Sequence, residues 1–358
     1  MKTVNVLGLR EKEEWDDFIS ASPDTTFYHT YEWTEILRVG AGIVPSFWGL
    51  WLDGALAVIW PCFVVPAFGG KVLSFYSAST DYAPLVRSGV KLECLNEIVQ
   101  HVLSTAKKQD VLHWSFDAPK HSYFVNIAPN LGFTTAPSPR CTYTVDTTLP
   151  SEALWKQLDN KTRRLVRKAR TRGLEVKTSR EPDDLSSFLS IYQATMRRRH
   201  LTSLRDPDAL LPLLIQLENE GKAKLFVATS EGKIVAGALL LLHKQRAYGW
   251  LAGSNPESWL LSPNEVLIWN QIEWASKLGY SSIDLGGTPS QRTHGLHIFK
   301  RHFGGEEVDL MRFTLPVKHL KDAFCSAIVE TYRNVKQHGL VPGFLADRVL
   351  GDRDVWFD

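Results

Sequence analysis

A lysine flanked by aromatic side chains is the first candidate for chemistry in this sequence, in the stretch Phe299-Lys300-Arg301-His302-Phe303. It follows a predicted strand, a glycine pair and a polar loop, and loops at strand ends often carry active sites. At such a place an ammonium group can stabilise the oxyanion of an acyl-transfer intermediate or hold the terminal phosphate of an acyl donor. The same spacing also fits the commoner case of a surface lysine on an amphipathic turn. Lys300 is therefore a candidate catalytic residue, with both interpretations open.

A dense run of positive charge lies within a helix predicted over residues 152–172. Apolar residues recur on one face of this predicted helix, namely Leu154, Leu158, Leu165 and Ala169. The run holds a single acid, Asp159, and eight cations: Lys156, Lys161, Arg163, Arg164, Arg167, Lys168, Arg170 and Arg172. Unpaired cations at this density suit a phosphate backbone, although many charge runs are only solvated faces. The pattern does not distinguish RNA from a sugar nucleotide.

A second polar cluster ends the helix predicted over residues 182–200, and it comprises Thr195, Arg197, Arg198, Arg199 and His200. A guanidinium group donates two parallel hydrogen bonds to phosphate oxygens, so a diphosphate ligand is expected here. Cations in a last turn also compensate the helix dipole. Three arginines are more than compensation of the helix dipole requires, and their number favours the interpretation as a diphosphate site.

Three histidines close together, His294, His297 and His302, invite a metal interpretation. No cysteine or carboxylate stands at ligand spacing beside them, so we expect no metal. The glycine-rich dinucleotide loop, the P-loop and the G-x-S-x-G pattern are absent from the sequence. NAD chemistry, P-loop ATP chemistry and serine-hydrolase chemistry therefore have no support, and we expect no bound cofactor.

The phosphate-binding loop of N-acetyltransferases, R/Q-x-x-G-x-G/A, is also missing. In those enzymes backbone N–H groups of this loop meet the pyrophosphate of coenzyme A at a helix start. The corresponding loops here, residues 77–84 and 252–264, lack the pattern, and a partial match in residues 292–297 follows the wrong strand. The sequence therefore disfavours acyl-CoA as the donor.

Length and composition describe a folded globular chain, because 358 residues suffice for about two domains. A net charge of +2 means that attraction for nucleic acid must come from a local patch. The four cysteines are scattered, and the acidic N-terminus has no secretory apolar region. With no apolar run long enough to span a bilayer, we expect a cytoplasmic protein without a membrane span.

The order of predicted elements repeats once along the chain. A hairpin turns at Asp53-Gly54, with its outgoing strand expected over residues 55–65, and a strand, a loop, a helix and a strand follow. A second copy turns at Glu231-Gly232 and continues in the same order. Two copies of one unit of this kind predict an α/β fold with mixed sheets.

Five short motifs resemble those of the Fem family, the aminoacyl-tRNA-dependent transferases that build peptidoglycan interpeptide bridges. They are L-W-x-x-L-x-x-K-x-R-R in residues 154–164, K-A-R-x-x-G in 168–173, Y-x-x-T-x-x-R in 192–198, D-L-G-G in 284–287 and F-K-x-x-F-G in 299–304. The resemblance covers most of the chain and implies two tandem acyl-CoA N-acyltransferase-like (GNAT) domains. We expect them at residues 1–150 and 151–316, with residues 317–358 returning to pack on the first. The coiled-coil arm of many Fem proteins is missing, as in the shorter members.

The resemblance also implies roles for individual residues. Phe299 and Lys300 match the family's residues at the 3′ end of tRNA, with Lys300 stabilising charge while the acceptor amine attacks the ester directly. Arg198 matches the cation for the acceptor's diphosphate. The other residues expected to bind substrate are Trp33, Asp81, Tyr82 and Thr195. Contacts to tRNA are expected from Lys161, Arg163, Arg164, Arg167 and Lys168.

The sequence as a whole predicts a cytoplasmic aminoacyltransferase. Its expected donor is aminoacyl-tRNA, and its expected acceptor is an amine of a nucleotide- or lipid-linked cell-wall precursor such as a UDP-muramyl peptide. One open alternative is an acyl-CoA-dependent N-acyltransferase of polysaccharide or natural-product biosynthesis. Another is a catalytically silent protein that binds RNA or a sugar nucleotide. The sequence does not reveal the transferred group, the exact acceptor or the oligomeric state.

Overall fold

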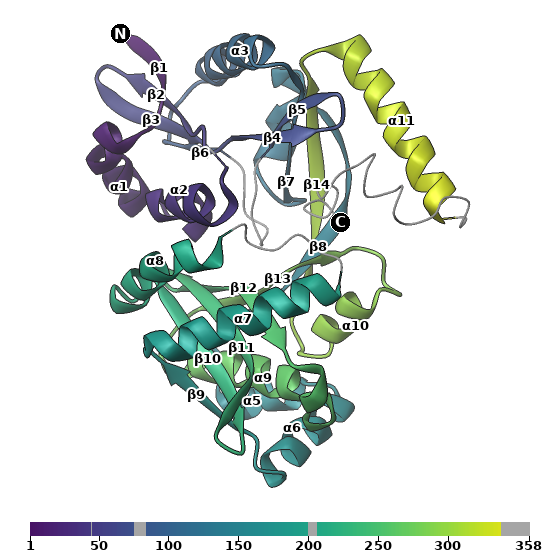
Figure 1. Ribbon diagram of the computed structural model, residues 1–358. Coiled ribbons are helices and arrows are strands. Elements are labelled where there is room, and N and C mark those ends of the chain that lie inside the picture. The colour runs from purple at the N-terminus through teal and green to yellow at the C-terminus, as the bar shows by residue number, and fades with distance from the viewer. Residues whose placement is uncertain (44, 75–83, 200–205, 338–358) are drawn as a thin grey trace.

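The computed structural model describes residues 1–43, 45–74, 84–199 and 206–337. Two α/β halves lie one above the other in Figure 1, with the N-terminal elements in the upper half and α5 to α10 in the lower half. Within these residues no helix is at once long and apolar enough to cross a membrane.

The upper half is built from strands of two to thirteen residues, together with helices and single turns. Its strands are β1 (Lys2–Val6), β2 (Trp48–Leu52), β3 (Ala55–Trp60), β4 (Phe63–Ala67), β5 (Gly70–Ser74), β6 (Leu85–Val86), β7 (Val111–Pro119) and β8 (Thr134–Asp146). Its helices are α1 (Lys12–Ala21), α2 (Tyr31–Ile36), α3 (Leu92–Lys108) and the short α4 (Phe124–Ile127). Single turns add η1 (Leu9–Glu11), η2 (Phe27–His29), the π-turn η3 (Leu37–Ala41) and η4 (Ala128–Leu131).

The lower half holds the remaining elements, apart from β14, which runs beside β7 into the upper half, and α11, which lies beside the upper half in Figure 1. Its helices are α5 (Ser151–Gln157), α6 (Asn160–Thr171), α7 (Pro182–Arg198), α8 (Pro207–Asn219), the 3-10 helix η5 (Pro256–Leu261), α9 (Pro263–Lys277) and α10 (Gly295–Arg301). Its strands are β9 (Glu175–Ser179), β10 (Ala223–Ser230), β11 (Lys233–His243), β12 (Arg246–Ser254) and β13 (Ser282–Pro289). The strand β14 (Glu306–Pro316) pairs with β7 and β8, and the last helix of the described residues is α11 (His319–Gln337).

The predicted hairpin between β2 and β3 is confirmed, since Asp53 and Gly54 both have positive φ, at 51° and 82°. The single strand predicted over residues 55–65 is wrong. It breaks after Trp60, so that β3 joins the sheet β1-β2-β3-β6 and β4 joins a second, ten-stranded sheet. Pro61 stands at the break, where its missing N–H cannot continue a ladder.

The single basic helix predicted over residues 152–172 is also wrong, because it divides into α5 and α6. Leu158 has an extended backbone, and the carboxylate of Asp159 accepts a hydrogen bond from Lys161 N at 2.7 Å as the cap of α6. The anchoring face shifts accordingly, with Thr162, Val166 and Ala169 buried on α6. Asp159, the lone acid of the basic run, thus caps the start of α6 and does not neutralise the cations of the run.

One ten-stranded sheet joins the two halves, in the order β4-β5-β7-β14-β8-β13-β12-β11-β10-β9. The long strands β8 and β14 lie side by side at its centre, pairing from Thr134 with Thr314 to Thr144 with Glu306. The other edge of β14 pairs with β7, and the other edge of β8 pairs with β13. Neither half therefore completes its sheet without a strand of this central pair.

Two parallel strand pairs mark the repeated unit, β5 with β7 and β12 with β13. The second ladder is short, since its last pair is Tyr248 with Asp284. Beyond that pair β12 continues against β11 only, and β13 continues against β8 after a register shift. The two parallel strands thus stop pairing in the middle of the sheet.

A shared core holds the halves together. Trp33 of α2 is fully buried and packs edge to face on Tyr28 at 4.9 Å and on Trp250 of β12 at 5.8 Å between ring centroids. A hydrogen bond of 2.8 Å joins Thr25 Oγ1 to His243 Nε2 across the same contact. Aromatic burial of this kind stabilises the junction by several kcal/mol in total, at about 1.5–3 kcal/mol for each large side chain.

The C-terminal helix α11 packs on the upper half, beside β7. Asp322 Oδ1 lies 2.6 Å from His113 Nδ1, and Lys321 Nζ lies 2.8 Å from Asp110 Oδ2. Cys325 faces Gly69, where an added Cβ would meet its sulfur at 2.3 Å. The first strand and the last described helix are thus both attached to the same half.

The ion pair between Arg312 of β14 and Asp117 of β7 should contribute to stability, because both groups are largely shielded from water. Arg312 donates to the two carboxylate oxygens at 2.8 and 3.0 Å, and Ser138 Oγ of β8 donates to the same carboxylate at 2.8 Å. Arg312→Ala should lower the free energy of unfolding by about 1–3 kcal/mol, since it leaves Asp117 without its charged partner. Urea denaturation measures this loss. The matched control Lys277→Ala removes an exposed pair and should cost under about 0.5 kcal/mol; equal losses would contradict the argument.

Candidate active site

Lys300 is buried, with 7% of its surface exposed, so the interpretation as a surface lysine is wrong. It lies on the inner face of α10, a helix that begins after His294, whose Nδ1 accepts the Leu296 N–H at 3.2 Å. Its Nζ donates to the carbonyl oxygens of Gly286 at 2.6 Å and Gly287 at 2.8 Å. A protonated lysine has three N–H groups, so one more remains for an oxygen of a substrate.

The two carbonyl groups that accept hydrogen bonds from Lys300 lie just past the point where β12 and β13 stop pairing. Gly286 has a φ of 81°, which a residue with a side chain rarely adopts, and the register between β13 and β8 shifts here. Asp284 Oδ1 accepts from Gly286 N at 2.7 Å and lies 2.6 Å from Thr142 Oγ1. The D-L-G-G sequence therefore forms a bulge that turns two carbonyls toward α10.

Burial lowers the pKa of Lys300 to about 7, and Arg140 acts in the same direction. Asp284 and Cys141 oppose this shift by favouring the ammonium form. A lysine with a pKa near neutrality is present as both the ammonium ion and the free amine at physiological pH. As a cation it can stabilise an oxyanion, and as a free amine it can accept a proton from an attacking ammonium group.

Phe299 lies next to Lys300 and is half-buried, with its ring 5.3 Å from that of Phe303 in an edge-to-face contact. The end of α10 is tied to the start of α6, because Asp159 N donates to His302 O at 2.9 Å. A Cβ on Gly304 would lie 2.6 Å from the Cβ of Gln157, so glycine is required there. The basic helix and the helix of Lys300 are thus held in direct contact.

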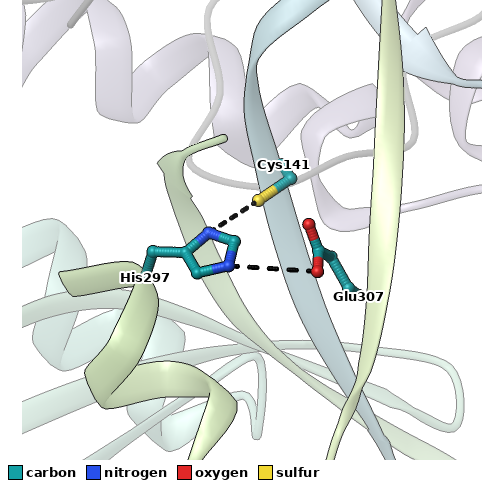
Figure 2. Close-up of side chains that lie close together, drawn as sticks. All are labelled: Cys141, His297 and Glu307. Atoms are coloured by element: carbon teal, nitrogen blue, oxygen red, sulfur yellow. Dashed lines mark hydrogen bonds and ion pairs between the residues drawn. The ribbon is translucent and has the colours of Figure 1, made fainter. Parts of the chain in front are cut away.

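A further polar cluster lies where α10 meets the sheet, and it consists of His297 of α10, Cys141 of β8 and Glu307 of β14 (Figure 2). Its thiol, imidazole and carboxylate atoms lie within 4.8 Å of one another. The Nδ1 of fully buried His297 is 3.1 Å from Pro289 O and 3.6 Å from Cys141 Sγ. Its Nε2 is 2.9 Å from the hydroxyl of Tyr143, which donates to Glu307 Oε2 at 3.3 Å.

These groups do not fit one metal ion, although their types are those of zinc ligands. Cys141 faces Nδ1 of His297, whereas Glu307 lies 3.9 Å from Nε2, and an ion in line with one ring nitrogen would face away from the other. Both nitrogens also have hydrogen-bond partners. The cluster instead fastens α10 to β8, β13 and β14, and so fixes the position of Lys300 one turn later.

Cys141 is unsuited to act as a nucleophile. Burial raises the pKa of its thiol to about 11, and Glu307 and Asp309 add to this shift. The thiolate, which is the reactive form, is therefore scarce at neutral pH. The sequence analysis missed this cluster because its members come from three segments, and the only local signal was His297 at one helical turn before Lys300.

The basic helix α6 presents most of its cations to solvent. Lys161, Arg164 and Lys168 are exposed. Arg167 is also exposed and lies over the ring of Trp155 at 5.5 Å. Arg163 differs, because it is half-buried and donates to Lys156 O at 2.7 Å, where it caps the end of α5.

The end of α7 places Thr195 and Arg198 against the end of β12. Buried Thr195 donates to Ile191 O at 2.9 Å and accepts from Ser254 N at 3.2 Å, so its hydroxyl attaches the helix to the strand. Arg198 donates to Ser254 O at 3.2 Å and lies 5.1 Å from the ring centroid of Trp259. Arg197 and Arg199 are exposed on either side.

The remaining sequence-predicted site residues are not brought next to Lys300 by any contact described here. Trp33 lies in the shared aromatic core, where its whole surface is covered. Asp81 and Tyr82 lie outside the described residues, as does His200. Their proposed roles in binding the acceptor stay predictions.

Residues 156–301 match the family model of the acetyltransferase (GNAT) domain. This stretch is a GNAT domain. It contains the β12/β13 pair and α10, and it makes the chain an acyltransferase. Among curated protein sequences, none matches this chain.

Solved structures extend the likeness to nearly the whole chain. FemX has a TM-score of 0.67 at 17% identity, covering 88% of this chain and 98% of its own. L-PGS from Bacillus licheniformis has a TM-score of 0.58 at 13% identity, covering 91% and 96%. A tandem GNAT protein from the clavulanic acid biosynthesis pathway has a TM-score of 0.57 at 12% identity, covering 88% and 99%. The fold is therefore a tandem GNAT fold, as the Fem resemblance implied.

The lowered pKa of Lys300 predicts a pH dependence of stability. Its pKa is about 7 in the fold, against an ordinary value of 10.5. Between these values the unfolded chain binds a proton that the folded chain lacks, so Lys300 makes the free energy of unfolding rise with pH across this window. Lys300→Met should flatten that rise by an amount on the order of a few kcal/mol.

Denaturation curves of both proteins over this pH range measure the difference. Exposed Lys277→Met is the matched control, because it removes a lysine whose side chain is 63% exposed. Wild-type and Lys300→Met curves that run parallel throughout would show that Lys300 has no lowered pKa.

Proposed function

We propose that this protein transfers an aminoacyl group from aminoacyl-tRNA to an amine of a peptidoglycan precursor, either a UDP-muramyl peptide or its lipid-linked form. The reaction forms an amide bond and breaks the ester bond to the tRNA ribose. The amine gives up a proton, and the ribose oxygen leaves with one. Such a reaction belongs in the cytoplasm, where charged tRNA and nucleotide-linked precursors occur together.

The observation that carries this proposal is the burial of Lys300 at the end of the β12/β13 ladder, against the carbonyls of Gly286 and Gly287. An ammonium group buried there stabilises the oxyanion of a tetrahedral intermediate more strongly than it would in bulk solvent. An aminoacyl ester is already activated, so alignment of ester and amine supplies much of the remaining rate. The protonated thiol of Cys141 fits direct attack by the amine, without an acyl-enzyme.

The start of α9 argues against coenzyme A as the donor. Coenzyme A needs N–H groups for its pyrophosphate at this helix start, but residues 255–262 contain no glycine, and prolines begin both η5 and α9. Glu265 lies in the first turn of α9, where a carboxylate opposes an anion. The loop is also filled by side chains, since Ser254 Oγ accepts from both Trp259 Nε1 and Asn264 Nδ2.

The exposed face of α6 supports RNA as part of the donor. Lys161, Arg164 and Lys168 are exposed, and among the residues that the structure describes no acid forms an ion pair with them. A row of unpaired cations binds a phosphate backbone by releasing counterions. Because α6 begins at a hydrogen bond to the end of α10, RNA bound here would lie beside the helix of Lys300.

The family match favours a second candidate, an N-acyltransferase that uses acyl-CoA, because its description is that of an acetyltransferase. The same lysine serves both reactions. The two candidates differ in the donor, and the donor is therefore what the experiments must establish.

Neutralising two exposed cations of α6 should weaken tRNA binding and its salt dependence. In Arg164→Gln/Lys168→Gln, the slope of log K against log salt should fall in magnitude by about 1.5, because each phosphate contact contributes about 0.7–0.9. Filter binding over about 50 to 200 mM salt measures the slope. Lys107→Gln/Lys108→Gln, on α3 of the other half, is the matched control. An unchanged slope in the α6 variant would exclude this face as the RNA contact.

Transfer itself is tested with a radiolabelled aminoacyl-tRNA pool and UDP-linked muramyl pentapeptide, with labelled acetyl-CoA as the competing donor. We expect label to move from tRNA to the peptide, and Lys300→Met to slow it about 10²- to 10³-fold, as loss of an oxyanion donor does. Lys277→Met should transfer at the wild-type rate. Transfer from acetyl-CoA alone would overturn the proposal in favour of the second candidate.

A further inference from the structure

Trp259 of η5 exposes 52% of its surface, yet its indole is held in a fixed position. Its Nε1 donates to Ser254 Oγ at 3.1 Å, and this oxygen also accepts from Asn264 Nδ2 at 3.2 Å. The guanidinium of Arg198 lies 5.1 Å from the ring centroid and is itself bonded to Ser254 O. An exposed aromatic ring held in this way loses little conformational entropy when a flat ligand stacks on it.

The surroundings of this indole are basic and continuous with α6. Arg172, at the end of α6, donates to the carbonyl oxygen of Leu260 at 3.2 Å, next to Trp259 in the chain. Arg172, Arg197 and Arg199 are all exposed, and Glu257 is the one exposed acid within η5. In Figure 1 the end of α7, α10 and α6 lie along the same side of the lower half.

We propose that Trp259, backed by Arg198, is a stacking platform for an unpaired nucleotide of an RNA whose backbone follows α6. Aromatic rings interleaved with cations are the usual means by which proteins bind single-stranded RNA, because every base has a face that stacks. A protein partner would not need so many cations. A single diphosphate bound near Trp259 would make no contact with the cations of α6. This inference rests on the proposed tRNA donor.

The platform and Lys300 lie at the same end of the β12/β13 strand pair. Tyr248 of β12 is level with Asp284 of β13. Ser254, which supports the indole, stands six residues beyond Tyr248, while the carbonyl of Gly287 stands three residues beyond Asp284. Both the support of the platform and the carbonyl that binds the ammonium therefore lie beyond the same end of the β12/β13 ladder. We expect an unpaired tail to stack on Trp259 while its terminal ester reaches Lys300.

The test compares two fluorescently labelled RNA hairpins, one with an unpaired 3′ tail of four nucleotides and one with the same duplex and a blunt end. Anisotropy should show that the wild type binds the tailed hairpin more tightly. Trp259→Ala should weaken that binding by about 5- to 100-fold and leave the blunt hairpin unchanged, and Trp259→Phe should retain most of it. Leu260→Ala, an exposed neighbour, is the matched control and should bind like the wild type.

The outcomes separate this inference from the proposed function. A wild type that binds neither hairpin would remove the tRNA donor, and the platform with it. Equal binding of the tailed hairpin by folded Trp259→Ala and wild type would remove the platform while leaving the donor intact. A third outcome is that uridine diphosphate displaces the tailed hairpin from the wild type but no longer does so in Trp259→Ala. That result would overturn the assignment of the platform to RNA and assign it to a nucleotide-linked acceptor instead.

Discussion

Backbone pairing between β8 and β14 is the constraint on which the rest of the fold depends. One edge of this pair continues into β7 of the upper half, and the other continues into β13 of the lower half. The same β8 segment supplies Cys141, Thr142 and Tyr143, and β14 supplies Glu307, to the surroundings of α10. The strands that join the halves therefore also set the position of the buried lysine.

Much of the fold follows from local sequence patterns, because hairpin turns and helix periodicity need only neighbouring residues. Asp53-Gly54 and Glu231-Gly232 adopt the positive φ values that such turns require. The sequence analysis did not predict β8, since its two prolines and exposed threonines lack the alternation of a typical strand. The sequence analysis also did not predict that a strand breaks at Pro61 and a helix at Asp159. Apolar residues continue at strand or helix spacing across both positions, so the pattern gave no sign of a break.

The candidate site was only partly predictable. Lys300 and its two aromatic neighbours stand in one short stretch, so their types and spacing were visible. Whether that lysine is buried depends on a bulge in β13 that the glycine pair does not reveal by itself, and on β8, which is remote from it in sequence. The grouping of Cys141, His297 and Glu307 depends on sheet register, and sheet register is set by the whole fold. Local reasoning finds residues that can react, and tertiary structure determines their environment.

The unbroken sheet limits how the two halves can move. Enzymes with two separate lobes often admit substrates by rotation about a hinge. Here such a rotation would have to break the ladders that β8 and β14 share with both halves, at a cost of many hydrogen bonds at once. We therefore expect the relative orientation of the lobes to change little, so that substrate entry and product release depend on movements of loops and side chains.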